Sequence, residues 1–220
     1  MIRIDSINKS FSTGRRKVRV LEDISFQVDG GECIAIKGRS GSGKTTLLNC
    51  MAGIEKPDNG SVLYGDKNIA SLSTNKLASF LRTNTGFVFQ NNNLISYLTV
   101  FENIAFPLNL NGVFGAKASK KIAKFLEIIG MEDAKNALPT ELSGGESLRV
   151  AVARALINKP RIVFADEPTA SLDSATAKVI IKLLTKIGKD QNCAVVFSTH
   201  DNEILDKTDR VLELKDGRLI

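Results

Sequence analysis

The 220-residue chain has the composition of a folded globular protein, with 43% hydrophobic and 25% charged residues. These proportions exclude a disordered chain, and the length allows one large or two small units with a sizeable core. The net charge of +6 is spread along the sequence without a basic block. We therefore expect no nucleic-acid partner, while a weak attraction to an anionic membrane surface stays open.

The cysteines indicate the redox state of the cellular compartment, and the longest uncharged run indicates whether a segment could cross a membrane. Cys33, Cys50 and Cys193 are odd in number, widely separated and set among apolar residues. This pattern predicts buried thiols in a reducing compartment and neither disulfides nor a metal site. Residues 1–5 lack a signal-peptide core. The uncharged run 83–101 contains a glutamine and three consecutive asparagines, so we expect no membrane-crossing segment in this chain.

The first part of the chain is predicted to be rich in strands. Residues 24–28 alternate between apolar and polar as a half-buried strand does, and residues 33–36 form a continuous apolar run typical of a buried strand. A glycine-rich loop follows directly, and residues 44–52 are predicted to form a helix. Further short strands are expected at 61–64 and 87–89.

From residue 91 to residue 159 the pattern is mostly helical, with helices expected at 119–129 and 144–157. Strand–helix alternation then returns, with a strand at 162–165, a helix at 174–187 and strands at 194–198 and 211–214. We predict a single α/β domain with an antiparallel β part near the N-terminus. Residues 1–90 and 160–220 would form its nucleotide-binding core, and residues 91–159 an inserted α-helical lobe.

The glycine-rich loop carries the strongest local signal. Residues 38–45 read Gly-Arg-Ser-Gly-Ser-Gly-Lys-Thr and match G-x-x-x-x-G-K-[ST], a loop that binds the phosphates of a nucleoside triphosphate. Its glycines let successive N–H groups turn inward, and the following helix points its N-terminus at the same anion. Lys44 is expected to reach the β- and γ-phosphates, and the Thr45 hydroxyl to ligate Mg²⁺. A chance glycine-rich turn is the alternative, which the strand–loop–helix context disfavours.

The apolar strand 162–165 delivers two carboxylates at its C-terminal end, where ligands bind in open α/β sheets. Asp166 is predicted to ligate Mg²⁺, and Glu167 is predicted to orient or deprotonate the attacking water. A surface Asp–Glu pair that only caps the strand is the alternative.

Residues 142–146, Leu-Ser-Gly-Gly-Glu, open the predicted helix 144–157. The Ser143 hydroxyl and the amides of Gly144 and Gly145 form a second potential anion site. A plain helix N-cap is the alternative, because this sequence also caps well. Two half-sites that cannot meet within one chain imply a head-to-tail dimer with two ATP molecules between the protomers.

The order and spacing of these three motifs resemble those of ATP-binding cassette (ABC) ATPases, over nearly the whole chain. The resemblance implies the ABC ATPase fold with its P-loop NTPase core, ATP and Mg²⁺ as cofactors, and ATP hydrolysis coupled to transport. It also implies a homodimer, a membrane-spanning permease subunit as partner, and a cytoplasmic location on the inner face of the cell membrane.

The resemblance assigns further roles. Phe11 sits where the family stacks an aromatic ring on adenine, and Gln90 in the loop that touches Mg²⁺ or the lytic water. Residues Ser171–Asp173 match the loop that links the two sites across the dimer, and His200 the histidine that contacts the γ-phosphate, with Asp201 able to orient it. The predicted catalytic residues are Glu167, His200 and Gln90; the predicted Mg²⁺ ligands are Thr45, Gln90 and Asp166; and the predicted ATP-binding residues are Phe11, Gly38, Arg39, Ser40, Gly41, Ser42, Gly43, Lys44, Thr45, Thr46, Ser143, Gly144, Gly145, Glu146 and Asp173.

The chain departs from the family pattern near residue 146. Glu146 stands where many members have glutamine, Leu148 where a glutamine is frequent, and Phe11 replaces the commoner tyrosine. A carboxylate at residue 146 would lie near a triphosphate, which places its contact with ATP in question.

One uncharged region points to a partner. Between Thr83 and Ala116 the only charged residue is Glu102, and five of the eleven phenylalanines fall there. Residues 91–99 are expected to be an exposed loop, and exposed apolar loops usually mark interfaces. This predicts a groove for a helix of the permease, with plain core as the alternative. Residues 98–108 resemble the macrolide-exporter and lipoprotein-release group, which implies export or extraction of an amphiphilic substrate.

Three other classes of nucleotide-binding protein fit less well. A non-transport ABC ATPase acting on a cytosolic or nucleic-acid partner would need a long coiled coil between the halves of the site, yet this segment has only about a hundred residues and no heptads. A translation-factor ATPase would carry two cassettes, and a P-loop kinase has no use for residues 142–146. Transport is therefore the favoured function.

Overall fold

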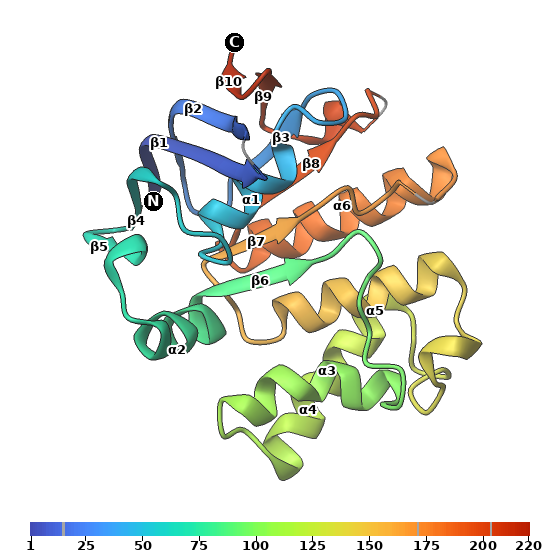
Figure 1. Cartoon of the computed structure of the whole chain (residues 1–220). Coiled ribbons are helices and arrows are strands. Elements are labelled where there is room, and N and C mark those ends of the chain that lie inside the picture. The colour runs from blue at the N-terminus through green and yellow to red at the C-terminus, as the bar shows by residue number, and fades with distance from the viewer. Residues whose placement is uncertain (15, 171, 203) are drawn as a thin grey trace.

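The computed structural model describes every residue except 15, 171 and 203 and contains two β-sheets (Figure 1). The smaller sheet has four antiparallel strands in the order β2-β1-β4-β5. Its strands are β1 (Ile2–Thr13), β2 (Arg16–Val28), β4 (Asn59–Tyr64) and β5 (Lys67–Asn68). It corresponds to the antiparallel part expected near the N-terminus, although the sequence analysis assigned no strand to residues 2–13.

The larger sheet has six strands in the order β10-β9-β3-β8-β7-β6, and only the β9–β10 pair is antiparallel. Strands β7 and β8 are buried along their whole length, which explains why they read as continuous apolar runs. The strands are β3 (Cys33–Lys37), β6 (Thr85–Val88), β7 (Ile162–Ala165), β8 (Ala194–Thr199), β9 (Arg210–Lys215) and β10 (Arg218–Leu219).

Six α-helices are described, and three of them, α3 to α5, gather on the side of the molecule away from the antiparallel sheet (Figure 1). They are α1 (Lys44–Met51), α2 (Thr74–Asn84), α3 (Val100–Leu110), α4 (Gly115–Ile129), α5 (Gly144–Leu156) and α6 (Ser174–Asp190). Short 3₁₀ turns occupy Ile69–Ser71, Pro139–Glu141 and Leu205–Lys207. Within the described residues, no helix combines the length and apolar character needed to cross a membrane.

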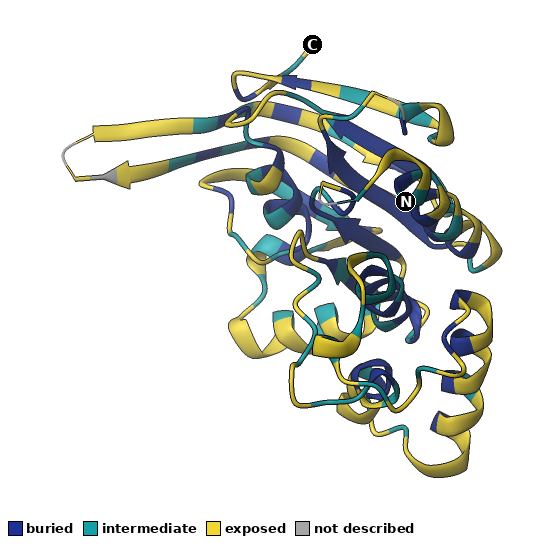
Figure 2. Ribbon diagram, turned by 90° about the vertical axis from the view of Figure 1, so that its right-hand side faces the viewer, coloured by how far each residue is buried: buried dark blue, intermediate teal, exposed yellow. Residues whose placement is uncertain are grey.

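Two hydrophobic cores lie on opposite faces of the parallel sheet. Its central strands are largely buried and are dark blue in Figure 2. Along β3, Cys33 and Ala35 belong to the core under α3 to α6, whereas Ile34 and Ile36 belong to the core under α1 and the antiparallel sheet. This division follows from the alternation of side chains along a strand. The three cysteines are all buried and unpaired, as the sequence predicted.

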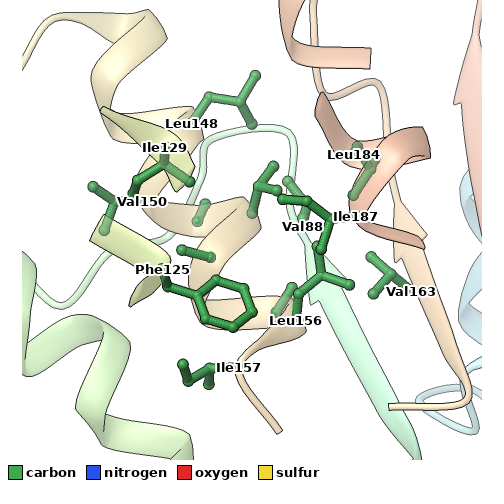
Figure 3. Packing of buried hydrophobic residues seen from close by; sticks show 14 of the residues in the cluster. Val88, Phe125, Ile129, Leu148, Val150, Leu156, Ile157, Val163, Leu184 and Ile187 are labelled. Atoms are coloured by element: carbon green, nitrogen blue, oxygen red, sulfur yellow. The ribbon is translucent and has the colours of Figure 1, made fainter. Parts of the chain in front are cut away.

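Helix α5 is the centre of the first core (Figure 3). Leu148, Val152 and Leu156 recur along one side of this helix at the spacing of an amphipathic stripe, and they are buried. Val150 and Ala153, on other sides of the helix, are buried as well. The reason is tertiary: α3, α4, α6 and β6 surround α5, so a single-stripe pattern underestimates its burial.

Candidate nucleotide site

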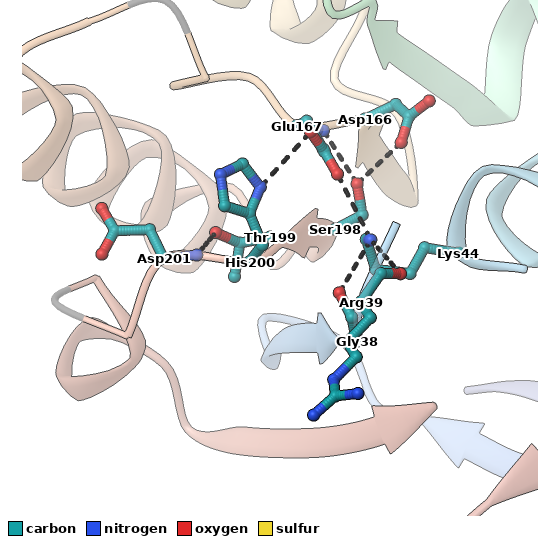
Figure 4. Close-up of polar contacts among 9 residues, drawn as sticks. All are labelled: Gly38, Arg39, Lys44, Asp166, Glu167, Ser198, Thr199, His200 and Asp201. Atoms are coloured by element: carbon teal, nitrogen blue, oxygen red, sulfur yellow. Dashed lines mark hydrogen bonds and ion pairs between the residues drawn. The ribbon is translucent and has the colours of Figure 1, made fainter. Parts of the chain in front are cut away.

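Four segments that are distant in sequence meet at the carboxyl edge of the parallel sheet. β3 leads into the glycine-rich loop, β7 into Asp166 and Glu167, β8 into His200, and β6 into the segment that contains Gln90. Because parallel strands all end at the same edge, their following residues converge, and this edge is where open α/β sheets bind ligands. Figure 4 draws the contacts made there.

The loop between β3 and α1 has the conformation that its glycines were expected to permit. Gly41 and Gly43 have φ values of 79° and 104°, in the left-handed region that glycine adopts without strain. At Gly43 a Cβ atom would lie 2.8 Å from the Val20 carbonyl oxygen, so a larger residue would displace the backbone. Helix α1 begins at the next residue, Lys44, which directs its N-terminus at the loop.

A cavity of about 330 Å³ opens beside this loop. Predicted site residues from three segments line it: Ser40, Gly41, Gly43, Lys44, Thr45, Thr46, Gln90 and Glu167. The remaining lining residue is Val20 of β2, which the sequence analysis missed. Its only sequence signal is its position on the strand that pairs with the strand of Phe11.

Lys44 connects the loop with the carboxylates (Figure 4). Its side chain is only 5% exposed, and its ammonium donates hydrogen bonds to the carbonyl oxygens of Gly38 at 2.9 Å and Arg39 at 3.1 Å. The same nitrogen lies 3.3 Å from Glu167 Oε1. The positive charge of Lys44 is therefore shared between the loop carbonyl groups and Glu167.

Ser198 of β8 forms hydrogen bonds with both Asp166 and Glu167 (Figure 4). Its hydroxyl donates to Asp166 Oδ1 at 2.7 Å and accepts the backbone N–H of Glu167 at 2.8 Å. Ser198 is fully buried in β8, so no water competes for these bonds. Glu167 itself has a φ of 41°, a conformation that costs a non-glycine residue on the order of 1 kcal/mol or more. The Ser198 hydrogen bond holds this backbone in place, a role that the sequence did not reveal.

His200 approaches Glu167 from the other side. Its Nδ1 lies 3.5 Å from Glu167 Oε2, and its side chain is 63% exposed. The two residues line a second cavity of about 510 Å³ together with Asp201 and Leu172. The backbone N–H of Asp201 donates to Thr199 Oγ1 at 3.0 Å. Glu167 thus lies between a lysine and a histidine, at the boundary of two cavities.

The predicted residues of the second half-site are in a different place, at the start of α5 and α6. Ser143 caps α5, and Glu146 Oε2 accepts its N–H at 2.8 Å and its hydroxyl at 2.6 Å. These hydrogen bonds lower the pKa of Glu146 below its ordinary value. Asp173 caps α6 through the N–H groups of Ala175 and Thr176. Gly144 and Gly145 form the first turn of α5, and Ser171 lies outside the described residues.

Asp166 is not among the described residues that line the 330 Å³ cavity, and four further predicted residues also lie outside this lining. Gly38, Arg39 and Ser42 line a neighbouring cavity of about 350 Å³ against β9 and the C-terminal turn. Phe11 is 40% exposed, and its described contact is with the Lys9 ammonium, 5.1 Å from the ring centroid.

Comparison with known proteins identifies the family. A family model described as ABC transporter matches residues 21–170. The lipoprotein-releasing system ATP-binding protein LolD of Syntrophotalea carbinolica is 39% identical over 219 residues, which cover 100% of this chain and 96% of that protein. The methionine import ATP-binding protein MetN 1 of Listeria innocua is 38% identical over 221 residues, covering 100% of this chain and 65% of that protein.

The chain belongs to the ABC transporter family of ATP-binding proteins. It is an ATPase of that family, and the resemblance to the lipoprotein-release group is confirmed by the LolD relatives. Solved ABC structures agree. The dimeric ATP-binding cassette MJ0796, in a post-hydrolysis state bound to ADP and Pi, matches with a TM-score of 0.92 and 35% identity, covering 100% of this chain and 96% of that one. CbiO1 of Clostridium perfringens matches with a TM-score of 0.88 and 32% identity, covering 100% and 86%. The predicted ABC ATPase fold is therefore confirmed.

Proposed function

We propose that two copies of this chain bind two MgATP molecules between them and use their hydrolysis to drive a separate permease in the cell membrane. The observation that carries the proposal is the position of Glu167, which lines the cavity beside the phosphate loop together with Lys44 and lies next to His200 in a second cavity. Its most direct test is Glu167→Gln, which should retain ATP binding and lose turnover.

The chemistry follows from the positions of these groups. Loop N–H groups and the start of α1 would bind the phosphates, and Lys44 would exchange its Glu167 contact for the β- and γ-phosphates. Glu167 would then be free to accept a proton from the attacking water, and His200 would contact the γ-phosphate. Thr45, Gln90 and Asp166 supply the oxygen donors that Mg²⁺ prefers, and the bound ion would neutralise charge on the phosphates.

The capped start of α5 supports a shared site. In the second protomer of a head-to-tail dimer, Ser143 and the amides of Gly144 and Gly145 would meet the γ-phosphate held by the first. Asp173 would follow at the same interface. Residues 1–90 and 160–220 would act as the nucleotide core of one domain, and residues 91–159 as the lobe that carries the second half-site.

A cavity of about 730 Å³ between α2 and α3 is the proposed permease site. Phe89 and Phe106 line it, with Ile95 from the loop that follows Gln90. Arg154 fixes this loop by donating to the carbonyl oxygens of Asn92 and Asn93, both at 2.7 Å. Because Phe89 immediately precedes Gln90, a permease helix bound here would adjoin the nucleotide site.

The proposed permease site differs from the sequence expectation, which placed the groove on residues 91–99. Leu94 and Phe101 pack against the core, and Tyr97 is 80% exposed outside the cavity lining. The segment is therefore partly core, because α3 and α5 lie beneath it. The apolar lining of the groove includes Phe87 of β6, Phe89 just after it, and Phe106, Pro107 and Leu110 of α3.

Leu110→Asp is expected to separate the ATPase from its permease while leaving the motor intact. Leu110 lines the cavity and is 50% exposed, so the free subunit should accept a charge there. In the complex the carboxylate would be buried without a partner, which costs several kcal/mol, and each ~1.4 kcal/mol lowers affinity tenfold. Co-purification with the permease should fall by at least ~10-fold, with the ATPase rate of the isolated subunit unchanged.

Phe114→Asp is the matched control, since Phe114 is 62% exposed and does not line this cavity. It should co-purify at wild-type yield. Wild-type yield for Leu110→Asp as well would place the permease site elsewhere. The thermal midpoint of each variant separates loss of docking from loss of folding.

Ser198→Ala is expected to lower kcat by ~10-fold while leaving the KM for ATP within about twofold, because it removes a positioning hydrogen bond and no phosphate contact. The left-handed Glu167 backbone would lose its N–H acceptor, and Asp166 a donor. Ser198→Thr keeps the hydroxyl and should recover most of the rate. If Ser198→Ala and the wild-type protein have the same kcat, Ser198 does not position Glu167.

The proposed cargo is an amphiphile that is exported or extracted from the membrane. The support is the similarity to LolD proteins, whose name assigns them to lipoprotein release. Reconstitution with the cognate permease, followed by an assay for release of a lipidated protein from vesicles, would test it. ATP-driven uptake of a water-soluble substrate instead would refute it.

A further inference from the structure

A third cavity, of about 540 Å³, lies where α4, the end of α5 and α6 meet. Among the described residues, none that lines this cavity also lines the nucleotide cavity or the proposed permease site. Its volume falls in the range of roughly 300–1,000 Å³ that is usual for small-molecule sites. No motif in the sequence predicts a site among its lining residues.

The floor of this cavity is apolar. Phe125 of α4, Ile157 after α5 and Ile187 of α6 are buried members of the first core, and Figure 3 draws all three in one region of it. Ile128 of α4 also lines the cavity and is 40% exposed. The core thus opens to solvent here through a pocket whose walls come from three different elements.

The rim of this cavity is positively charged. Lys121 and Lys124 are on α4, Lys159 follows α5, and Lys186 is on α6; among the described lining residues, Asp190 alone is acidic. Within the described part of the chain, none of the four lysine ammonium groups forms an ion pair or a hydrogen bond. Lysine stems can lie along apolar surface while their charged ends stay in water, so four cations surround an apolar floor.

We propose that this pocket binds one small anionic amphiphile, an acyl chain with a carboxylate head. The chain would lie on the apolar floor, and the carboxylate would face the lysine rim. The positive charge of the rim favours an anionic ligand. The limited volume of the cavity favours a ligand with one acyl chain over a larger partner surface. A protein partner is disfavoured because a stable interface takes roughly 20–30 residues on each side, whereas eleven described residues line this cavity.

The test is a calorimetric titration of the intact protein with decanoate, compared with decanol, which has the chain without the charge, and acetate, which has the charge without the chain. We expect saturable one-to-one binding of decanoate, and at least ~10-fold weaker binding of both other probes. Equal affinity for decanol, equal affinity for acetate, or no decanoate binding would each overturn the proposal. Binding of an acidic peptide without binding of decanoate would also overturn it.

Two pairs of variants locate the binding. Lys121→Glu with Lys124→Glu should weaken decanoate binding by ~10-fold or more, because two attractions become repulsions. Lys117→Glu with Lys120→Glu makes the same change in net charge on exposed positions of the same helix outside the pocket, and should leave binding unchanged. Equal effects of the two doubles would mean a general charge effect and refute the site.

Lys186→Glu tests the contribution of α6 to carboxylate binding, independently of α4. Lys182→Glu, on the same helix but outside the lining of the pocket, is its control. Lys121 is half-buried, whereas the other lysines named here are exposed. The α6 variants therefore place no glutamate in a half-buried position, so folding should not be disturbed. Decanoate should bind Lys186→Glu several-fold more weakly than Lys182→Glu. Equal affinity of these two variants would refute the assignment of the carboxylate to this rim.

Discussion

Glu167→Gln is expected to lower ATP turnover by ~10²–10⁴-fold, the usual contribution of a positioned general base. The amide has nearly the same shape, so it fills the same place between Lys44 and His200 but cannot accept the proton. ATP affinity should stay the same or rise, because the carboxylate no longer competes with the phosphates for the Lys44 ammonium. The measurements are steady-state ATPase rate and nucleotide titration on the same preparation.

The same variant should accumulate as an ATP-bound dimer, since hydrolysis is the step that would release the shared nucleotides. Size-exclusion chromatography with and without MgATP would detect it. Glu213→Gln is a suitable control, because Glu213 lines the neighbouring cavity on the far side of the loop. Turnover of Glu167→Gln within a few-fold of wild type would remove Glu167 from the role of base.

Lys44→Ala is expected to weaken ATP binding by at least ~100-fold, since charge-assisted hydrogen bonds contribute roughly 1.5–3 kcal/mol and this ammonium is expected to make more than one to the phosphates. The structure adds a second reason. Lys44 is the described cation nearest to Glu167 Oε1, at 3.3 Å, so its removal leaves that carboxylate facing the triphosphate. Titration with fluorescent ATP measures the change directly.

Because Lys44 and Glu167 are in contact, their variants should not be additive. The double variant Lys44→Ala with Glu167→Gln should bind ATP more tightly than Lys44→Ala alone, since it removes the uncompensated carboxylate. Lys215→Ala, beside the loop but in the neighbouring cavity, should bind ATP as wild type does. Unchanged affinity for Lys44→Ala would contradict its assignment to the phosphates.

Local sequence was a good guide wherever the physical signal was local. The glycine pattern of residues 38–45 specified a loop between a strand and a helix, because few other residues adopt its dihedrals. β7 was predicted with its observed bounds, Ile162–Ala165, because a strand buried on both faces is an uninterrupted apolar run. The caps at Ser143 and Asp173 begin α5 and α6 where the sequence placed those helices.

Elements without a buried stripe were harder to predict. Helix α2 was missed, and none of its residues is fully buried, so its apolar periodicity is weak. The length of α6 was underestimated because its last turn, after Ile187, is polar and exposed except at Gly188. In both cases the helix is supported by neighbours in space, which sequence patterns do not record.

The sequence by itself determined the family, the α/β class, and which residues could meet a triphosphate, because these follow from backbone dihedrals, strand burial and the spacing of motifs. Only the tertiary structure decided which of those residues share a cavity. It placed Val20 rather than Phe11 in the lining, and it connected Asp166 and Glu167 through the buried hydroxyl of Ser198. Such contacts depend on the order of strands in the sheet, where β7 and β8 are neighbours although about 30 residues separate them in the chain.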